Sequence, residues 1–332
     1  MGYEEFKIML LERLQEKMGS SVKVKFEMLQ KNNGTEVEAV VLSDCGHVMP
    51  APHVKDLYEL YQRQGEDGGF DACISMIEQL YASKDTIPVD KIFKPWDEVE
   101  DGVKDKIMPV LINKKWNKEI LRDAVYKEFL DFAIILWAPM FETSDGNGTV
   151  RINKKILDLW GVSENELWEV AFRNLKNEEF LVQNLFEALS EVLGGSYVED
   201  GDILQDNHGS EKGKPAGGTG LEHKTAKPGE NALMEGGGGF QYLMTNRMRN
   251  HGAVGMLRTD LLQKLAQKEG CSLFILPSSI HEIILAPDRG TFSAEMLRET
   301  VESINREQVE KWERLSDNVY YFRKGGDKVE IL

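Results

Sequence analysis

Two short apolar runs on either side of a polar turn constrain the fold of this chain more than any other feature. Residues 273–276 and 283–285 flank the turn at residues 277–282, and short uninterrupted apolar runs are typical of buried strands. Amphipathic helical stripes come before and after them, at residues 254–265 and 297–304. This order predicts an α+β fold, in which mixed or antiparallel sheets are packed with amphipathic helices.

Residues 1–85 predict a unit of helices with one hairpin. Apolar residues recur at helical spacing over residues 6–18, and two further helical stripes occupy residues 54–61 and 70–81. Between them, alternating segments flank Asn33 and Gly34. An Asn-Gly pair supplies the positive φ angles that a tight hairpin needs, so we expect an N-terminal helix, a hairpin and a helical pair.

Residues 86–200 predict a central α+β region. Residues 110–112 and 132–137 are apolar enough to be buried strands of one sheet. Residues 150–152 alternate between apolar and polar and predict a further strand.

Two helices are predicted near the end of this central region. Ser163 and Glu166 have the spacing of a capping box, which predicts that a helix begins there. The apolar spacing of residues 181–192 predicts a second helix.

A change of composition precedes the C-terminal region. Residues 201–239 contain 11 glycines among 39 residues and no aromatic residue, so they cannot bury enough apolar surface to offset their chain entropy. We interpret this segment as a disordered linker or insertion. Residues 240–332 then form a C-terminal α+β region with the order strand, helix, two strands, helix and a hairpin around Gly325 and Gly326.

The charge of the chain bears on its partners and location. Asp and Glu total 56 against 40 Lys and Arg, a formal charge of −16, which repels phosphate backbones and argues against direct nucleic-acid binding. The same acidity fits an ordinary solvated surface or a DNA-mimic decoy that captures a DNA-binding protein.

No apolar run approaches the roughly 18 residues of a membrane span, and acidic residues near the start are unlike a signal peptide, so we expect a cytoplasmic protein without membrane association. Three cysteines without close pairing imply no disulfide framework.

Ser278, Ser279, His281 and Glu282 are the candidate catalytic residues. A serine nucleophile needs a base within hydrogen-bond reach and a third group that orients the base. In an extended strand Ser279 and His281 share one face while Ser278 and Glu282 share the other, which divides the set. The alternative is structural, with the serine hydroxyls bonded to turn backbone between two strands.

Two groups of side chains have the chemistry of metal ligands. One consists of His251, His281 and Glu282, and the other of Cys45, His47 and His53. Neither has the paired spacing that identifies zinc motifs. We therefore expect polar turns at both places and no metal or other cofactor.

The basic stretch before residue 259 is the candidate ligand-binding site. No acidic residue occurs between Gly236 and Thr259, whereas three arginines do. A helix N-terminus offers free N–H groups and partial positive charge, and guanidinium groups beside it bind carboxylates or phosphates. The residues expected to hold a small anion are Asn246, Arg247, Arg249 and His251, with Arg258 nearby. The alternative is a solvated basic turn that balances an acidic surface.

Several short motifs outside the glycine-rich segment occur together in one known family. They lie at residues 117–121, 130–133, 167–174, 242–246, 277–282 and 315–320. With them the chain resembles an uncharacterised bacterial family, domain of unknown function 5688. The resemblance supplies no reaction, cofactor or catalytic residue, and it implies only a host-facing or accessory role.

Three functions are consistent with these patterns. The leading hypothesis is a binding or accessory protein that is not an enzyme and acts through an unidentified protein partner or a small anionic ligand near Arg247, Arg249 and His281. It rests on the absence of a complete catalytic set beside a localised run of arginines. The first alternative is a hydrolase or metal-dependent enzyme centred on Ser279, His281 and Glu282. The second is the acidic decoy.

Overall fold

The structure is a computed structural model of the chain. It describes residues 1–43, 51–65, 68–82, 92–143, 146–185, 188, 242–277 and 279–332. The predicted linker at residues 201–239 and the candidates Cys45, His47 and Ser278 lie outside the described residues.

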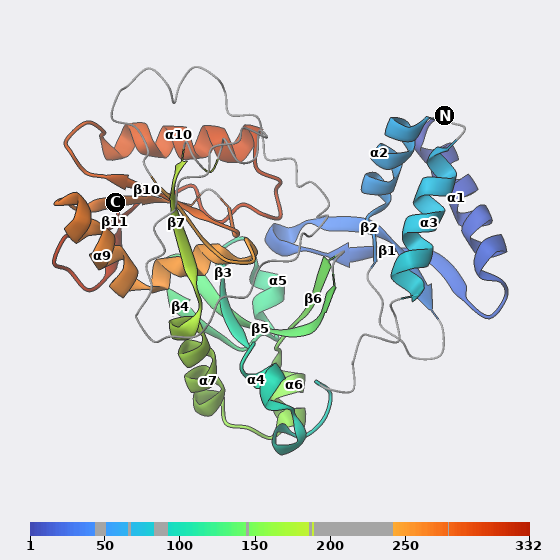
Figure 1. The fold of residues 1–332 in the computed structure, drawn as a ribbon, viewed down its shortest axis with the longest axis horizontal. Coiled ribbons are helices and arrows are strands. Elements are labelled where there is room, and N and C mark those ends of the chain that lie inside the picture. Colours follow the sequence, from blue (N-terminus) through green and yellow to red (C-terminus); the bar gives the residue numbers. More distant parts are fainter. Residues whose placement is uncertain are drawn as a thin grey trace, which may run out of the picture.

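The N-terminal lobe, residues 1–82, consists of helices packed against the base of a long hairpin (Figure 1). Its elements are α1 (Tyr3–Met18), β1 (Lys23–Gln30), β2 (Glu36–Ser43), α2 (Val54–Gln64) and α3 (Gly69–Ala82). The predicted helices and hairpin are therefore confirmed. Phe6, Leu10, Leu57 and Phe70 belong to an apolar core that is separate from the core of the rest of the chain.

Asn33 sets the turn at the tip of the hairpin. Its φ is 59° and that of Gly34 is 62°, so both residues adopt the left-handed conformation that the Asn-Gly pair predicts. The turn, η1 (Asn32–Gly34), joins β1 and β2 in antiparallel register from Gln30 opposite Glu36 to Lys23 opposite Ser43.

A four-stranded antiparallel sheet forms around the long strand β5 (Phe132–Thr143). β3 (Met108–Asn113) pairs along its first half, as the apolar runs predict, and β4 (Tyr126–Phe129) also pairs there. β6 (Gly146–Arg151) pairs with the second half. The turn η4 (Trp96–Glu98) and the short helix α4 (Asp101–Lys104) precede these strands, α5 (Lys118–Leu121) connects β3 to β4, and α6 (Lys154–Trp160) follows β6.

A six-stranded antiparallel sheet has the order β12-β11-β9-β10-β8-β7. Its strands are β7 (Phe180–Asn184), β8 (Tyr242–Asn246), β9 (Leu273–Leu276), β10 (Ile283–Pro287), β11 (Tyr320–Phe322) and β12 (Val329–Ile331). The predicted C-terminal order of elements, including the hairpin around Gly325, is confirmed. The regions at residues 86–200 and 240–332 contribute strands to this one sheet.

β7 corrects the helix expected from residue 181. Phe180 and Val182 are buried whereas Leu181 and Gln183 are more exposed, which is the two-residue period of a strand. Leu181 and Leu185 have helical spacing, but the stronger determinant is the pairing of β7 with β8 along its whole length. Most of the remainder of the predicted helix lies outside the described residues.

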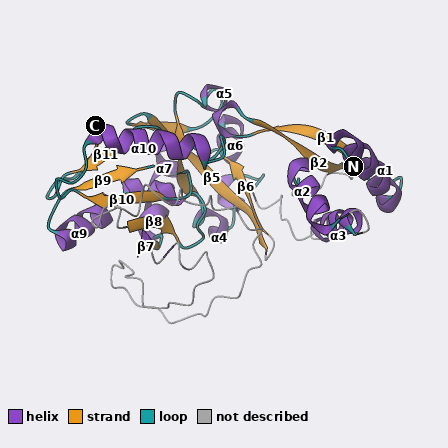
Figure 2. Ribbon diagram, turned by 90° about the horizontal axis from the view of Figure 1, so that it is seen from above, coloured by secondary structure: helices purple, strands orange, loops and turns teal. Residues whose placement is uncertain are grey.

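The main apolar core contains side chains from both sheets, such as Leu111 and Phe132 from one and Ile275 and Leu285 from the other. Helices α7 (Glu164–Asn177) and α9 (Thr259–Glu269) and the turn η5 (Gly252–Leu257) add to it. Helix α10 (Ala294–Glu307) packs on the other face of the six-stranded sheet (Figures 1 and 2). The fold is α+β with antiparallel sheets, as predicted.

Helix starts in this part follow local capping. The Ser163 hydroxyl accepts a hydrogen bond from the Glu166 N–H at 3.2 Å, so α7 begins where the capping box predicts. Ser293 caps α10 in the same way. Among the described helices, none has the length and apolar character that crossing a membrane requires.

Candidate functional site

The segment between β9 and β10 is a turn held by one serine side chain. The Ser279 hydroxyl donates to Glu282 Oε1 at 2.7 Å and accepts from the His281 N–H at 2.9 Å. A hydroxyl that bonds backbone two residues ahead competes with an extended conformation. The expectation that strand alternation separates Ser279 from Glu282 is therefore wrong, because the structure brings these two side chains together.

The same geometry separates Ser279 from a catalytic base. Its hydroxyl has one proton, which it donates to Glu282, and the residue is only 5% exposed. The His281 ring points elsewhere: Nδ1 accepts from the His251 backbone N–H at 3.3 Å, and Nε2 lies 3.7 Å from Glu313 Oε1. A neutral imidazole that accepts at Nδ1 carries its proton at Nε2, facing Glu313. Ser279 and His281 are neighbours here without forming the hydrogen-bonded pair that nucleophilic catalysis needs.

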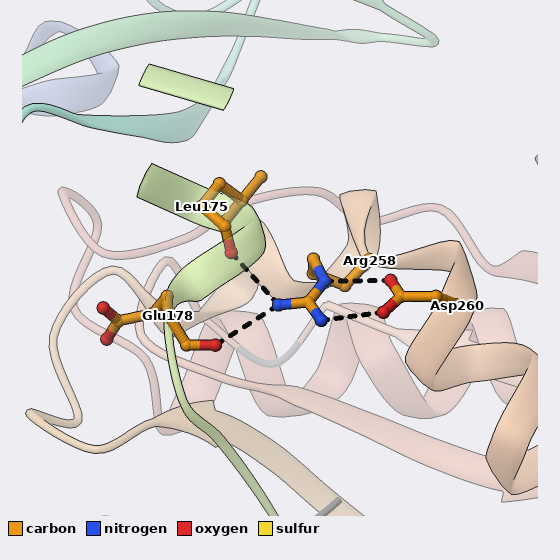
Figure 3. A network of polar contacts seen from close by, with 4 residues as sticks. All are labelled: Leu175, Glu178, Arg258 and Asp260. Carbon is orange, nitrogen blue, oxygen red and sulfur yellow. Dashed lines mark hydrogen bonds and ion pairs between the residues drawn. The ribbon is translucent and has the colours of Figure 1, made fainter. Parts of the chain in front are cut away.

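Arg258 is part of the architecture and does not contribute to an anion site. Its Nε and Nη2 donate to the two carboxylate oxygens of Asp260 at 2.8 and 2.7 Å, and Nη1 donates to the carbonyls of Leu175 and Glu178 (Figure 3). The residue is 8% exposed, and its hydrogen bonds lower the pKa of the Asp260 carboxyl. Arg258 ties the start of α9 to the end of α7, which corrects the expectation that it clamps a ligand.

The other predicted anion-binding residues do not converge either. Arg247 Nη1 lies 3.3 Å from Glu179 Oε2, and both side chains are about half exposed. Asn246 exchanges two hydrogen bonds with the backbone of Asn250 and so closes its own turn. Arg249 has a φ of 50° within that turn. His251 lies against His281, with ring centroids 5.5 Å apart.

The predicted helix start at Gly252 is closed to a ligand. The turn η5 is only six residues long, and a Cβ on Gly252 would lie 2.4 Å from Thr245 Oγ1 and 2.5 Å from the His281 carbonyl oxygen. Thr245 Oγ1 also donates to that carbonyl at 2.7 Å. Glycine is required here because β8, η5 and the β9–β10 turn pack backbone against backbone.

His251 is the centre of a different site. It has a φ of 55°, and its ring lies between Trp137 and His281, with centroids 4.3 and 5.5 Å away. Burial, with a smaller contribution from His281, lowers the His251 pKa from 6.5 to about 3. The imidazole is thus neutral at physiological pH. Its Nδ1 is buried and has no hydrogen-bond partner among the described residues.

Two further side chains, Trp137 beside His251 and Arg151 opposite Trp137, share this lack of partners. Trp137 Nε1 and Arg151 Nε are also buried without a hydrogen-bond partner in the described structure. Trp137 on β5 and Arg151 on β6 are directly opposite each other, so their side chains lie on one face of the sheet. Among the described residues, Arg151 makes one long ion pair, with Nη2 3.9 Å from Asp123 Oδ1. We call Trp137, Arg151 and His251 the Trp137 cluster.

The Trp137 cluster can bind a group that accepts hydrogen bonds. The Trp137 and Arg151 nitrogens are donors only, and leaving such a group buried and unpaired costs roughly 1–3 kcal/mol. An acceptor that reached either nitrogen would recover that free energy. The sequence predicts Trp137 only as part of the buried strand at residues 132–137, and Arg151 only as part of the strand at residues 150–152. It does not single out either as a site residue, because it is the pairing of β5 with β6 that brings them together.

A second polar cluster, the Asp131 network, is complete. Asp131 Oδ1 accepts from the Tyr320 hydroxyl at 2.6 Å, and Oδ2 accepts from Ser316 Oγ and Asn318 Nδ2, each at 3.0 Å. Burial, together with the hydrogen bond to Asp131 and its negative charge, raises the Tyr320 pKa well above its usual range. The network joins the start of β5 to the segment before β11, and both segments belong to motifs that the sequence singles out.

The metal candidates are not assembled in the described part of the chain. No group of three or more His, Cys, Asp or Glu side chains there is placed to hold an ion. His53 precedes α2, with Nδ1 3.3 Å from Asp56 Oδ2, while Cys45 and His47 are not described. His251 and His281 are adjacent but face different neighbours.

Comparisons with known proteins agree with the resemblance seen in the sequence. No curated protein and no solved structure matches this chain. The model of the family of unknown function DUF5688 matches residues 3–324. That range contains the helices of the N-terminal lobe, the Trp137 cluster and every strand of the two sheets except β12. The chain therefore belongs to the family of unknown function DUF5688.

Proposed function

We propose that this protein binds a small anion, through a carboxylate or phosphate group, at the Trp137 cluster. The observation that supports the proposal is that Trp137 Nε1, Arg151 Nε and His251 Nδ1 are all buried and unpaired. Native proteins satisfy the large majority of buried polar groups. Three such groups on touching or paired residues indicate a missing partner. The sequence predicts a cytoplasmic location, and we place this function there.

The chemistry of the cluster selects the ligand. Arg151 supplies a positive charge and Trp137 an N–H donor, so the ligand must supply acceptor oxygens. His251 is neutral because its pKa is about 3, and it adds a hydrogen bond without a second charge. A carboxylate or phosphate meets these requirements, whereas a cation meets none of them.

Binding is favoured over hydrolysis because the catalytic candidates are occupied with one another. Ser279 donates its proton to Glu282, and His281 accepts from His251 and faces Glu313. A hydrolase centred on these residues would have to rearrange the turn. The acidic decoy stays a prediction from the net charge of −16.

The direct test is an NMR titration of the indole N–H groups. The chain has six tryptophans, and Trp137→Phe identifies the signal of Trp137. We expect sodium phosphate or sodium acetate to move this signal with a saturable dependence on concentration. The Trp160 signal is the internal control, because its Nε1 already donates to the Ile92 carbonyl at 2.7 Å. If neither anion moves the Trp137 signal, or if both indole signals move alike, the proposal is wrong.

A matched pair of arginine variants then locates the charge. Arg151→Gln should weaken binding of the same anion about 10- to 100-fold, since hydrogen bonds to charged groups contribute roughly 1.5–3 kcal/mol. Arg247→Gln removes an arginine that is half exposed and paired with Glu179, and should leave the affinity within about twofold. Equal losses in the two variants would point to nonspecific attraction of anions.

A further inference from the structure

The tip of the N-terminal hairpin is anchored in the rest of the molecule by one residue, Asn33, through its backbone and its side chain. The hairpin extends from the N-terminal lobe to the sheets (Figures 1 and 2). At its end Asn33 is 7% exposed. Its backbone N–H donates to Asn117 Oδ1, and Asn117 Nδ2 donates back to Asn33 Oδ1, both at 2.7 Å.

The amide nitrogen of Asn33 holds a particular turn of the body. Nδ2 donates to the carbonyls of Lys311 and Arg314, each at 2.7 Å. These carbonyls belong to residues 310–314, which we call the Glu313 turn. The lobe contacts this turn twice more, where Lys55 Nζ lies 3.8 Å from Glu310 Oε1 and where the His53 ring lies 6.3 Å from that of Trp312.

The Glu313 turn also contacts the segment beside the Trp137 cluster. The Glu313 carbonyl accepts from the Ile280 N–H at 2.8 Å, and Glu313 Oε1 lies 3.7 Å from His281 Nε2. His281 Nδ1 in turn accepts from the backbone of His251. Asn33 is thus linked through the backbone of the Glu313 turn to Glu313, and Glu313 is linked through His281 to His251 and Trp137.

We propose that Asn33 is a positioning residue that couples docking of the N-terminal lobe to the shape of the anion site. This inference rests on the proposed function of the Trp137 cluster. The lobe has its own apolar core, so it can stay folded when the tip contact breaks, and the molecule then has a docked and an undocked state. Coupling follows because the docked state holds Glu313 against His281, and an anion that favours that arrangement also favours docking.

Two variants of the same turn test the coupling. Asn33→Asp keeps the size, the tolerance for positive φ and the acceptor for Asn117, but it replaces the donor to two carbonyls with a carboxylate. Asn32→Asp makes the same chemical change one residue earlier, at a side chain that has no hydrogen bond within the described residues. Hydrogen exchange of the Ile280 amide and the Trp137 indole shift are measured in both, without added anion.

We expect Asn33→Asp to speed exchange of the Ile280 amide at least tenfold and to move the Trp137 indole signal. Asn32→Asp should change neither. The amide of Leu285, in the centre of the six-stranded sheet, reports whether the body stays folded. Asn33→Gly, which tolerates the left-handed conformation, gives the same comparison if the aspartate prevents folding. Native-like exchange at Ile280 and an unmoved indole signal in both Asn33 variants would overturn the coupling.

The anion titration separates this inference from the proposed function. If phosphate and acetate do not bind the native protein, the anion site is wrong, while the exchange of Ile280 still decides whether the lobe positions the turn. If they bind, Asn33→Asp should weaken the affinity at least threefold relative to Asn32→Asp. Equal affinities in the two variants would show that docking and binding are independent.

Discussion

The Asp131 network and the Trp137 cluster lie near the beginning and the middle of the same strand, and they differ in completeness. Each joins the four-stranded sheet to the C-terminal part of the chain, one through Tyr320 and the other through His251. In the first, both carboxylate oxygens of Asp131 accept hydrogen bonds. In the second, three buried nitrogens have no partner in the described structure. A satisfied buried network fixes an architecture, whereas an unsatisfied one costs free energy unless a ligand completes it.

The largest expected effect is the loss of stability when the complete network is broken. Tyr320→Phe removes the hydroxyl that donates to Asp131, and we expect the free energy of unfolding to fall by about 2–3 kcal/mol, as for a hydrogen bond to a charged group. Urea denaturation measures the change. Tyr321→Phe is the control, because its hydroxyl donates to Asp288 at the same distance of 2.6 Å but from a more exposed position. A larger loss at residue 321 than at residue 320 would contradict the assignment of Asp131 to the architecture.

Arg258, whose three guanidinium nitrogens all donate hydrogen bonds, and Arg151, whose Nε lacks a partner in the described structure, allow the same comparison between two single side chains. Arg258→Gln breaks the bidentate pair with Asp260 and frees two buried carbonyls, and should cost about 2 kcal/mol of unfolding free energy. Arg151→Gln loses only a long, partly exposed ion pair and should stay within about 0.5 kcal/mol of the native value. Denaturation of both variants in anion-free buffer checks this. Similar losses would mean that Arg151 is as structural as Arg258.

Local chemistry made most of the fold predictable. Asn33 and Gly34 specify their turn through φ angles that few residues adopt, and Ser163 specifies a helix start through one hydrogen bond. Apolar runs identify β3, β5, β9 and β10 because strands buried in a sheet need no polar positions. The helix predicted from residue 181 was wrong because the apolar residues of this short segment fit both the helical period and the two-residue period of a strand. Pairing with β8 makes the segment a strand.

The site was less predictable because its residues meet through pairing and turns. His251 and His281 were both candidates, and they do meet, but Trp137 and Arg151 depend on the register between β5 and β6. Local charge and a predicted helix start selected Arg247 and Arg258, although nearby carboxylates and carbonyls occupy them. A sequence shows which arginines exist, and only the fold shows which of them lack a partner.

Acid should destabilise the protein through the incomplete cluster. The folded pKa of His251 is about 3, against 6.5 for a free histidine, so below pH 6.5 the unfolded chain binds a proton that the folded chain does not. Stability from this residue is complete above pH 6.5 and is lost as the pH falls toward 3. Between pH 7 and 5.5 we expect a loss of about 1 kcal/mol.

The control for this pH dependence is His251→Asn, which tolerates the left-handed backbone and does not titrate. Urea denaturation of both proteins at several pH values gives the difference between their stabilities. That difference should shrink or reverse on acidification, since only the native protein carries the histidine. A constant difference from pH 7 to 5.5 would show that His251 is not buried in its neutral form.

The smallest expected effect is the most specific one. Trp137→Phe removes an N–H that is buried without a partner in the described structure. The gain from removing this unpaired donor, about 1 kcal/mol, should offset the loss of ring area, so we expect the net unfolding free energy to change by less than about 0.5 kcal/mol. Trp160→Phe removes about the same area and also breaks a bond to the Ile92 carbonyl, at a further cost of about 1 kcal/mol. In anion-free buffer Trp160→Phe should therefore be the less stable variant.

In saturating phosphate the native protein should gain stability that Trp137→Phe lacks, because a ligand that binds only the folded state stabilises it. Equal gains in stability in the two proteins would show that the anion binds elsewhere.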